Sequence, residues 1–181
     1  MKSLLAAFMF LLPIYAFSGA KAAGAYAGSA GIADSSLYKV PELIGSVNGY
    51  ITEADFSVKG MQGVVSYRSD MRPDNYYTVY QVSGISVKPG EILETKIKSS
   101  GTEGQRVFLY ADWNGDGHFE SEYSAVKGKK AANFCKPVEV PAGAVPGKAR
   151  LRVRLSDDKL NGSDYRVISG SVYDFIIDIN E

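Results

Sequence analysis

From about Tyr50 to its end, the sequence is a succession of short runs rich in Val, Ile, Tyr, Phe and Thr, divided by Gly, Pro, Asn and Asp. β-Branched and aromatic residues favour the pleated surface of a sheet, and the dividing residues favour turns. No segment shows a long helical period. The pattern predicts strands over residues 50–58, 63–69, 75–82, 91–98, 105–111, 134–140, 149–155 and 172–179. About eight strands without helices favour an all-β fold, an antiparallel β-sandwich or jelly roll.

Alternation assigns two faces to each of the last two predicted strands. In residues 149–155, the aliphatic side chains share one face, and Arg150, Arg152 and Arg154 share the other. The final strand places Asp174 and Asp178 opposite its apolar residues. If the two strands are neighbours, the arginines and aspartates can pair across the sheet, and each exposed pair would contribute only about 0.2–1 kcal/mol. The charged rows are consistent with solvated faces or with a ligand-binding surface.

The first 23 residues have the pattern of a secretory signal peptide. Lys2 precedes an apolar stretch over residues 4–17, and small residues follow with candidate cleavage points after Ala20, Ala22 and Ala23. The apolar stretch is short for a permanent membrane anchor. We therefore expect an exported protein that is extracellular, periplasmic or associated with the cell surface, with no transmembrane segment after signal cleavage.

The mature chain is predicted to be one domain behind a leader. Residues 24–49 are expected to form a flexible leader with the first contacts to the fold, and residues 50–181 the domain itself. Cleavage after Ala23 leaves 18 basic and 20 acidic residues, a formal charge of −2, which gives no support for nucleic-acid binding. Cys135 is the single cysteine, so rigidity must come from the core or from a bound ion rather than from an internal disulfide.

The segment DWNGDGHFE, residues 112–120, concentrates oxygen-bearing side chains directly after a predicted strand. Counted from its first residue, such side chains occupy the first, third, fifth and ninth places, namely Asp112, Asn114, Asp116 and Glu120. Calcium takes roughly six to eight oxygen ligands, and this spacing lets one tight loop surround a single hard cation. Gly117 permits the sharp turn, and the main-chain carbonyl of His118 is the expected backbone ligand. Oxygen ligands without thiolate or clustered imidazole favour calcium over zinc.

The segment differs from a helix-flanked EF-hand in two respects. Its twelfth place is Tyr123 rather than glutamate, and a predicted strand precedes the loop. Glu122, one residue earlier, is a further candidate ligand. The alternative interpretation is a metal-free turn in which the same side chains accept local hydrogen bonds. Without a bidentate closing glutamate, we expect a modest affinity of the extracellular grade.

Three motifs resemble the GEVED domains, which are β-rich modules of secreted bacterial proteins. Residues 108–119, FLYADWNGDGHF, resemble the family pattern W-I-D-W-N-x-D-G-x-F. Residues 140–153, VPAGAVPGKARLRV, resemble V-P-x-x-A-x-x-G-x-x-R-M-R-V, and Tyr67-Arg68-Ser69-Asp70 with the nearby Tyr76-Tyr77 forms an earlier match. The resemblance extends from about Tyr50 to the C-terminus. It implies an accessory module, of the kind found beside peptidases, other hydrolases or adhesive repeats, and it implies no catalysis.

The closing motif of the family is degenerate in this sequence. Gly170-Ser171-Val172-Tyr173-Asp174-Phe175 stands where G-E-V-E-D-Y is expected, so both glutamates are replaced. Asp174 alone could close a calcium shell or hold an arginine such as Arg152.

Sequence features favour a binding protein over an enzyme. His118 is the only histidine and lies inside the acidic segment, so we expect no nucleophile–histidine catalysis. The alternative is a secreted carbohydrate-active or proteolytic enzyme that uses surface carboxylates, although no pair is singled out. Tyr76, Tyr77 and Tyr80 are candidate contacts for a glycan or protein ligand, or else residues of the sheet and its core. We expect a calcium-stabilised module for extracellular recognition or adhesion.

Overall fold

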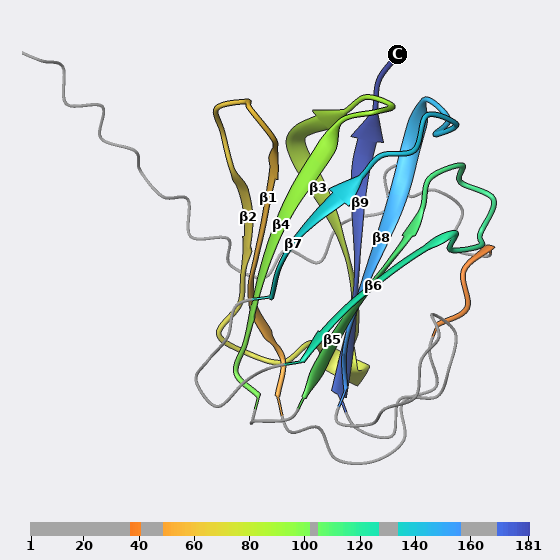
Figure 1. Cartoon of the computed structure of the whole chain (residues 1–181). Helices are drawn as coiled ribbons and strands as arrows, with labels where there is room; N and C mark the ends of the chain where they lie inside the picture. The colour runs from red at the N-terminus through yellow and green to blue at the C-terminus, as the bar shows by residue number, and fades with distance from the viewer. Residues whose placement is uncertain (1–36, 41–48, 102–104, 127–133, 157–169) are drawn as a thin grey trace, which may run out of the picture.

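The computed structural model of the protein describes residues 37–40, 49–101, 105–126, 134–156 and 170–181 (Figure 1). The predicted signal peptide and most of the predicted leader lie outside these ranges. Helical structure within them is limited to short turns such as η2 (Asp74–Tyr76). Among the helices of the described residues, none has the length and apolar character needed to cross a membrane.

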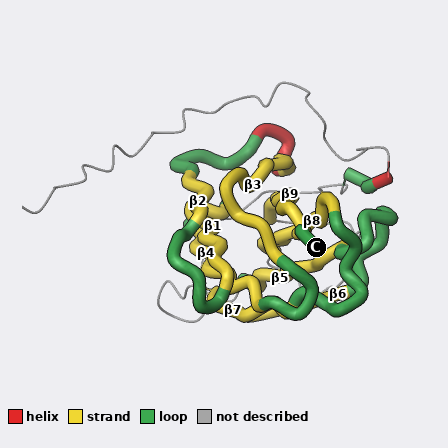
Figure 2. Tube along the Cα trace, turned by 90° about the horizontal axis from the view of Figure 1, so that it is seen from above, coloured by secondary structure: helices red, strands yellow, loops and turns green. Residues whose placement is uncertain are grey.

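The described strands form two sheets that pack face to face as layers, as the view from above shows (Figure 2). The four-stranded sheet has the order β2-β1-β4-β7 and contains β1 (Ile51–Val58), β2 (Val65–Arg68), β4 (Ile92–Ser99) and β7 (Phe134–Glu139). The five-stranded sheet has the order β3-β9-β8-β5-β6 and contains β3 (Tyr77–Val87), β5 (Arg106–Asp112), β6 (Ser121–Val126), β8 (Gly147–Ser156) and β9 (Gly170–Ile179). Only β3 and β9 pair in parallel among these strands; the other pairs are antiparallel. The all-β sandwich prediction is confirmed.

Two strands differ from the sequence-based prediction. β6 is a strand that the sequence analysis did not predict. Its sequence, SEYSAV, is more polar than those of the other strands and has no clear strand pattern. β3 continues past the predicted end at residue 82 to Val87. Its register against β9 shifts between Gln81 and Ser86, and Gly84 adopts a φ of 89° in that interval. The strand therefore continues past the glycine with a local irregularity in its pairing.

The core lies between the two sheets and is built from the inward-facing residues of both. Phe175 of β9 lies at an aromatic cluster, with ring centroids 4.9 Å from Phe56, 5.7 Å from Tyr67 and 6.2 Å from Tyr80. Phe56 belongs to the opposite sheet, so this cluster joins the two layers. Tilted and edge-on aromatic pairs each contribute about 0.5–1.5 kcal/mol beyond simple burial.

The outer face of the four-stranded sheet carries partly exposed charges. Arg68 of β2 contacts Glu53 and Asp55 of β1 at 3.5 and 2.6 Å, and Lys98 of β4 lies 2.7 Å from Glu53. The Arg68 side chain is 50% exposed. Solvent screening leaves such pairs with little net effect on stability.

The middle of the outer face of the five-stranded sheet is buried, in contrast to the outer face of the four-stranded sheet. Arg150, Arg152 and Arg154 of β8 and Asp174 of β9 lie on this face, and each is at most 2% exposed. The sequence prediction that β8 and β9 can pair their charges holds, since Arg152 is the direct cross-strand partner of Asp174. The interpretation as solvated faces is wrong for these four residues, whereas Asp178 of the same row pairs with Lys148 and is 40% exposed.

Candidate metal site in the loop after β5

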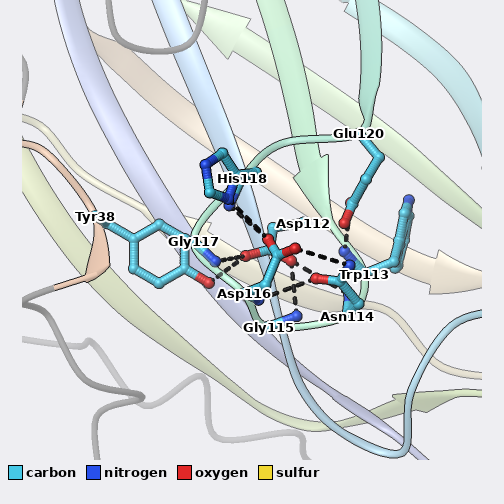
Figure 3. Close-up of polar contacts among 9 residues, drawn as sticks. All are labelled: Tyr38, Asp112, Trp113, Asn114, Gly115, Asp116, Gly117, His118 and Glu120. Atoms are coloured by element: carbon cyan, nitrogen blue, oxygen red, sulfur yellow. Dashed lines mark hydrogen bonds and ion pairs between the residues drawn. The ribbon is translucent and has the colours of Figure 1, made fainter.

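The acidic segment forms the connection between β5 and β6, at one end of the sandwich (Figures 1 and 3). β5 ends at Asp112, whose cross-strand partner in β8 is Arg150. The connection is closed by the main-chain N–H of Glu120, which donates to the carbonyl of Ala111 at 2.9 Å. It is joined to the β7–β8 connection by the N–H of Val145, which donates to the carbonyl of Trp113 at 3.1 Å.

Asp112 organises the connection with its buried carboxylate. Its Oδ1 accepts hydrogen bonds from the main-chain N–H groups of Asn114 at 3.2 Å and Gly115 at 2.7 Å. Its Oδ2 accepts from the N–H of Gly117 at 2.9 Å and from the hydroxyl of Tyr38 at 2.5 Å. Since three of these donors belong to the connection itself, one side chain determines how the backbone turns after β5.

Asn114 and Asp116 repeat this pattern further along. The N–H of Asp116 donates to Oδ1 of Asn114 at 2.9 Å, and the N–H of His118 donates to Oδ1 of Asp116 at 2.8 Å. The His118 N–H lowers the pKa of the Asp116 carboxyl below its ordinary value, so this carboxylate is charged at neutral pH. The His118 ring points into solvent, 87% exposed, with Nδ1 3.3 Å from the same carboxylate oxygen.

The two glycines of the connection allow its tight path. Gly115 and Gly117 have φ values of 75° and 91°, in the region that disfavours residues with a Cβ. At Gly117 a Cβ would also lie 2.9 Å from the main-chain oxygen of Leu37, so a glycine is required for the close approach of residues 37–40.

Three carboxylates of the connection converge. One oxygen from each of Asp112, Asp116 and Glu120 lies within 4.8 Å of the other two. Calcium binds oxygens at about 2.3–2.6 Å, so two ligands on opposite sides of the ion are about 5 Å apart. The cluster therefore has the donor type, charge and spacing to hold a metal ion. Asn114 borders it, since its Nδ2 donates to Oδ2 of Asp116 at 3.2 Å.

Glu120 also has a structural contact. Its Oε2 accepts the main-chain N–H of Trp113 at 3.0 Å, which joins the two ends of the connection. The hydrogen bonds of Asp112, Asn114, Asp116 and Glu120 are those of the metal-free turn that the sequence left as an alternative. At Asp116 and Glu120 the two interpretations are compatible, because each carboxylate has about four acceptor positions and the hydrogen bonds do not fill them. At Asp112 four donors already occupy these positions, so an ion would have to replace one of them.

The two additional candidate ligands lie elsewhere on the five-stranded sheet. Glu122 belongs to β6 and faces Tyr110 of β5. Asp174 is buried among donors: Nε and Nη2 of Arg152 lie 2.8 and 2.9 Å from its two oxygens, and Nη1 of Arg150 lies at 3.1 Å. Neither residue is part of the three-carboxylate group.

The three candidate tyrosines have different surroundings. The Tyr77 hydroxyl donates to Asp174 at 2.7 Å on the buried outer face. Tyr80 packs against the core beside Tyr67, with ring centroids 5.3 Å apart. Tyr76 adopts a φ of 60° and lies under the guanidinium of Arg72, 4.8 Å from the ring centroid.

Sequence reasoning missed Tyr38, which lies in the predicted leader. Its ring stacks under the guanidinium of Arg150 at 3.7 Å and lies 5.8 Å from the ring of Phe119. Burial and the hydrogen bond to Asp112 raise the pKa of Tyr38 above its ordinary value, so its hydroxyl is a donor at neutral pH. Only an isolated Leu-Tyr pair between uncharged small residues and Lys39 marked this position in the sequence.

The fold and the acidic connection define a β-sandwich module with a candidate metal-binding loop. Residues 106–178 match the family model of the GEVED domain, the family that the motifs resemble, and the resemblance is confirmed for this part of the chain. The matched range runs from β5 into β9 and includes the acidic connection. The earlier motif at residues 67–77 lies outside it.

Likeness to whole proteins adds little to this assignment. No curated protein matches the chain. Among solved structures, the chain is similar to a family 123 glycoside hydrolase from Clostridium perfringens, described for the details of glycolipid glycan hydrolysis, with 12% identity and a TM-score of 0.32. The alignment covers 72% of this chain and 27% of that chain. A likeness this weak says nothing about activity.

Proposed function

We propose that this chain is a secreted, non-catalytic β-sandwich module whose acidic connection binds calcium. The bound ion rigidifies one end of the sandwich, and that end recognises an extracellular glycan or protein ligand or serves in adhesion. The observation that carries the proposal is the convergence of Asp112, Asp116 and Glu120 within 4.8 Å.

Calcium suits the chemistry of this group. All the side-chain donors are hard oxygens, and three of them are carboxylates, which favours Ca²⁺ or Mg²⁺ over zinc or copper. Calcium tolerates irregular oxygen shells, whereas magnesium requires a near-ideal octahedron and gives up its water reluctantly. Asp112, Asn114, Asp116, Glu120 and the main-chain carbonyl of His118 would hold the ion, which would supply positive charge that offsets the repulsion among the carboxylates.

The same end of the sandwich presents apolar side chains to solvent. Met61 and Val64 lie in the turn between β1 and β2, and Val145 lies in the β7–β8 connection that is hydrogen-bonded to Trp113 (Figure 1). Their exposed fractions are 60%, 60% and 49%, and Leu37, which contacts Gly117, is 51% exposed. Exposed apolar groups at the same end of a sandwich as a rigid charged loop are typical of recognition surfaces.

The non-catalytic assignment rests on the position of the single histidine. The His118 ring is turned to solvent and its nearest acidic partner is Asp116, a candidate ion ligand. A Ser-His-Asp or Cys-His arrangement would have to use this ring. Cys135, the one possible thiol partner, belongs to β7 in the other sheet.

A melting experiment tests the calcium site. At a calcium concentration a hundredfold above the dissociation constant, the wild-type protein should gain about 2.7 kcal/mol of stability. Asp116→Ala should lose this gain, while Glu94→Ala, which changes an exposed acidic residue of β4 in the other sheet, should keep it. An equal gain in Asp116→Ala and wild type would exclude this loop as the site.

A binding experiment tests the recognition surface. The probes are a glycan array and the native cell surface, with bound protein quantified by an epitope tag. Met61→Ser and Val145→Ser should weaken binding, and Met71→Ser, an exposed methionine after β2 at the far end of the sandwich, should not. Hydrolysis of a glycan or peptide that is abolished by changing one surface carboxylate would instead establish an enzyme.

A further inference from the structure

Residues 37–40 are attached to the candidate metal loop mainly through Tyr38. Its side chain is 5% exposed, whereas Leu37, Lys39 and Val40 are exposed. Figure 3 shows the Tyr38 ring pointing into the loop, with its hydroxyl directed at Asp112. Arg150 covers one side of the ring at 3.7 Å from its centroid. One aromatic side chain thus fastens this part of the leader to the domain.

The hydroxyl of Tyr38 occupies an acceptor position that a cation would need. A carboxylate has about four lone-pair positions, two on each oxygen. Those of Asp112 are filled by four hydrogen bonds: the N–H groups of Asn114 and Gly115 on Oδ1, and the N–H of Gly117 with the Tyr38 hydroxyl on Oδ2. A cation that takes Asp112 as a ligand must displace one of these donors.

The four donors are not equally easy to displace. The three N–H groups are set by the path of the backbone, which turns through Gly115 and Gly117, so their removal would require the connection to refold. The Tyr38 hydroxyl comes from a separate segment and can leave by rotation of its side chain or by departure of residues 37–40. Arg150, which covers the Tyr38 ring, also contacts Asp174 at 3.1 Å, and this contact does not involve Tyr38.

Resting on the proposed calcium site, we propose that Tyr38 and the cation compete for Asp112, so that calcium releases residues 37–40 from the loop. Tyr38 then acts as a clip that the ion opens: residues 37–40 are held on the domain at low calcium and released at high calcium. The two equilibria are linked, so their effects are equal: attachment of Tyr38 weakens calcium binding by the same factor by which calcium weakens the attachment of Tyr38.

Calcium titration of three proteins tests the competition. The probe is calcium chloride, measured by isothermal titration calorimetry on the mature chain. Tyr38→Phe removes only the hydroxyl and should bind calcium about tenfold more tightly than wild type, a difference of about 1.4 kcal/mol. Tyr77→Phe is the matched control, because its hydroxyl donates to Asp174 on the same buried face rather than to Asp112, and its affinity should equal that of wild type.

Proteolysis gives a second readout, which does not depend on measuring calcium affinity. Lys39 is adjacent to Tyr38 and exposed, so cleavage after Lys39 by the lysine-specific endoproteinase Lys-C, followed by mass spectrometry, reports on whether the clip is open. Calcium should accelerate this cleavage in wild type and in Tyr77→Phe. In Tyr38→Phe the cleavage should be fast without calcium and change little when calcium is added.

The outcomes separate this proposal from the calcium site itself. Calcium binding with equal or weaker affinity in Tyr38→Phe, or calcium that leaves cleavage after Lys39 unchanged or slower, overturns the competition and leaves the site intact. Failure of all three proteins to bind calcium at millimolar concentration overturns the site and the competition together.

Discussion

Arg152 and Asp174 form a two-point ion pair in the interior of the protein. Nε and Nη2 of Arg152 lie 2.8 and 2.9 Å from Oδ1 and Oδ2 of Asp174, and both side chains have no exposed surface. Tyr77 and Arg150 donate to the same carboxylate at 2.7 and 3.1 Å. Asp174 is the surviving aspartate of the degenerate closing motif, and in the structure it is the negative partner of Arg152 and Arg150 on this buried face.

Asp174→Asn should strongly destabilise the protein. The change keeps the shape of the side chain but leaves buried guanidinium groups without their negative partner, and breaking a buried pair costs about 3–5 kcal/mol. Urea unfolding followed by circular dichroism measures the effect. Asp178→Asn is the control, because Asp178 pairs with Lys148 with both side chains 40% exposed and should change stability by less than about 1 kcal/mol. Similar losses in the two variants would contradict the importance of the buried pair.

Gly170→Ala should disrupt the start of β9. Gly170 has a φ of 138°, and a Cβ there would lie 1.8 Å from the main-chain oxygen of Leu155 in β8. The strand pair would have to separate at this point, at a cost of about 3 kcal/mol. Gly143→Ala is the control: a Cβ at this position would have no other atom within 4 Å, so the change in stability should be less than about 0.5 kcal/mol. Thermal melts of both variants are the measurement, and a Gly170→Ala variant as stable as Gly143→Ala would be unexpected.

Stability should fall as the pH rises above about 10. Burial, and for two of them a hydrogen bond to an aspartate, raises the pKa of Tyr38, Tyr77 and Tyr173 above the ordinary value of 10.0. A raised pKa means that the folded state holds protons which the unfolded state releases, so the stabilisation is complete below pH 10 and is lost as the pH increases. Absorbance at 295 nm measures ionised tyrosine. Tyr77→Phe should lower the final absorbance of the unfolded protein without changing that of the folded protein near pH 10.5; an equal decrease in both states would contradict the raised pKa.

Glu120→Gln separates the two interpretations of the acidic connection. Glutamine retains an oxygen that can accept the N–H of Trp113, so without calcium the melting temperature should stay close to that of wild type. It removes one of three converging negative charges, so most of the calcium-dependent gain in melting temperature should disappear. If the connection is only a hydrogen-bonded turn, wild type and Glu120→Gln will melt alike with and without calcium.

Residue patterns in the sequence predicted the fold well, but they predicted the surroundings of individual side chains poorly. Alternation in β8 separates Arg150, Arg152 and Arg154 from the aliphatic residues of that strand, and the structure has this separation. The pattern could not reveal that the arginine face is buried, because alternation reports which side chains share a face and not what covers that face. β6 was not predicted because its sequence, SEYSAV, is mostly polar. Its hydrogen-bonded neighbour β5, RVFLYAD, has the apolar run that is typical of a strand.

The spacing of residues within the acidic connection predicted a compact loop. Contacts between residues far apart in the sequence could not be predicted in this way. The interval between Asp112 and Glu120 is short enough for the sequence to predict one compact loop, and its three carboxylates converge. The hydroxyl of Tyr38 reaches Asp112 across 74 residues, a contact that no local pattern encodes. The relation of Asp174 to two arginines likewise depends on the pairing of β8 with β9.

A crystal of the mature protein grown with calcium tests the calcium site most directly. X-ray data collected at a long wavelength, where calcium scatters anomalously, locate the ion independently of the refined coordinates. One anomalous peak should lie among the carboxylates of Asp112, Asp116 and Glu120, with oxygens at about 2.3–2.6 Å. At full calcium occupancy, a loop without such a peak and with its hydrogen bonds from Asn114, Gly115 and Gly117 unchanged would contradict calcium binding there.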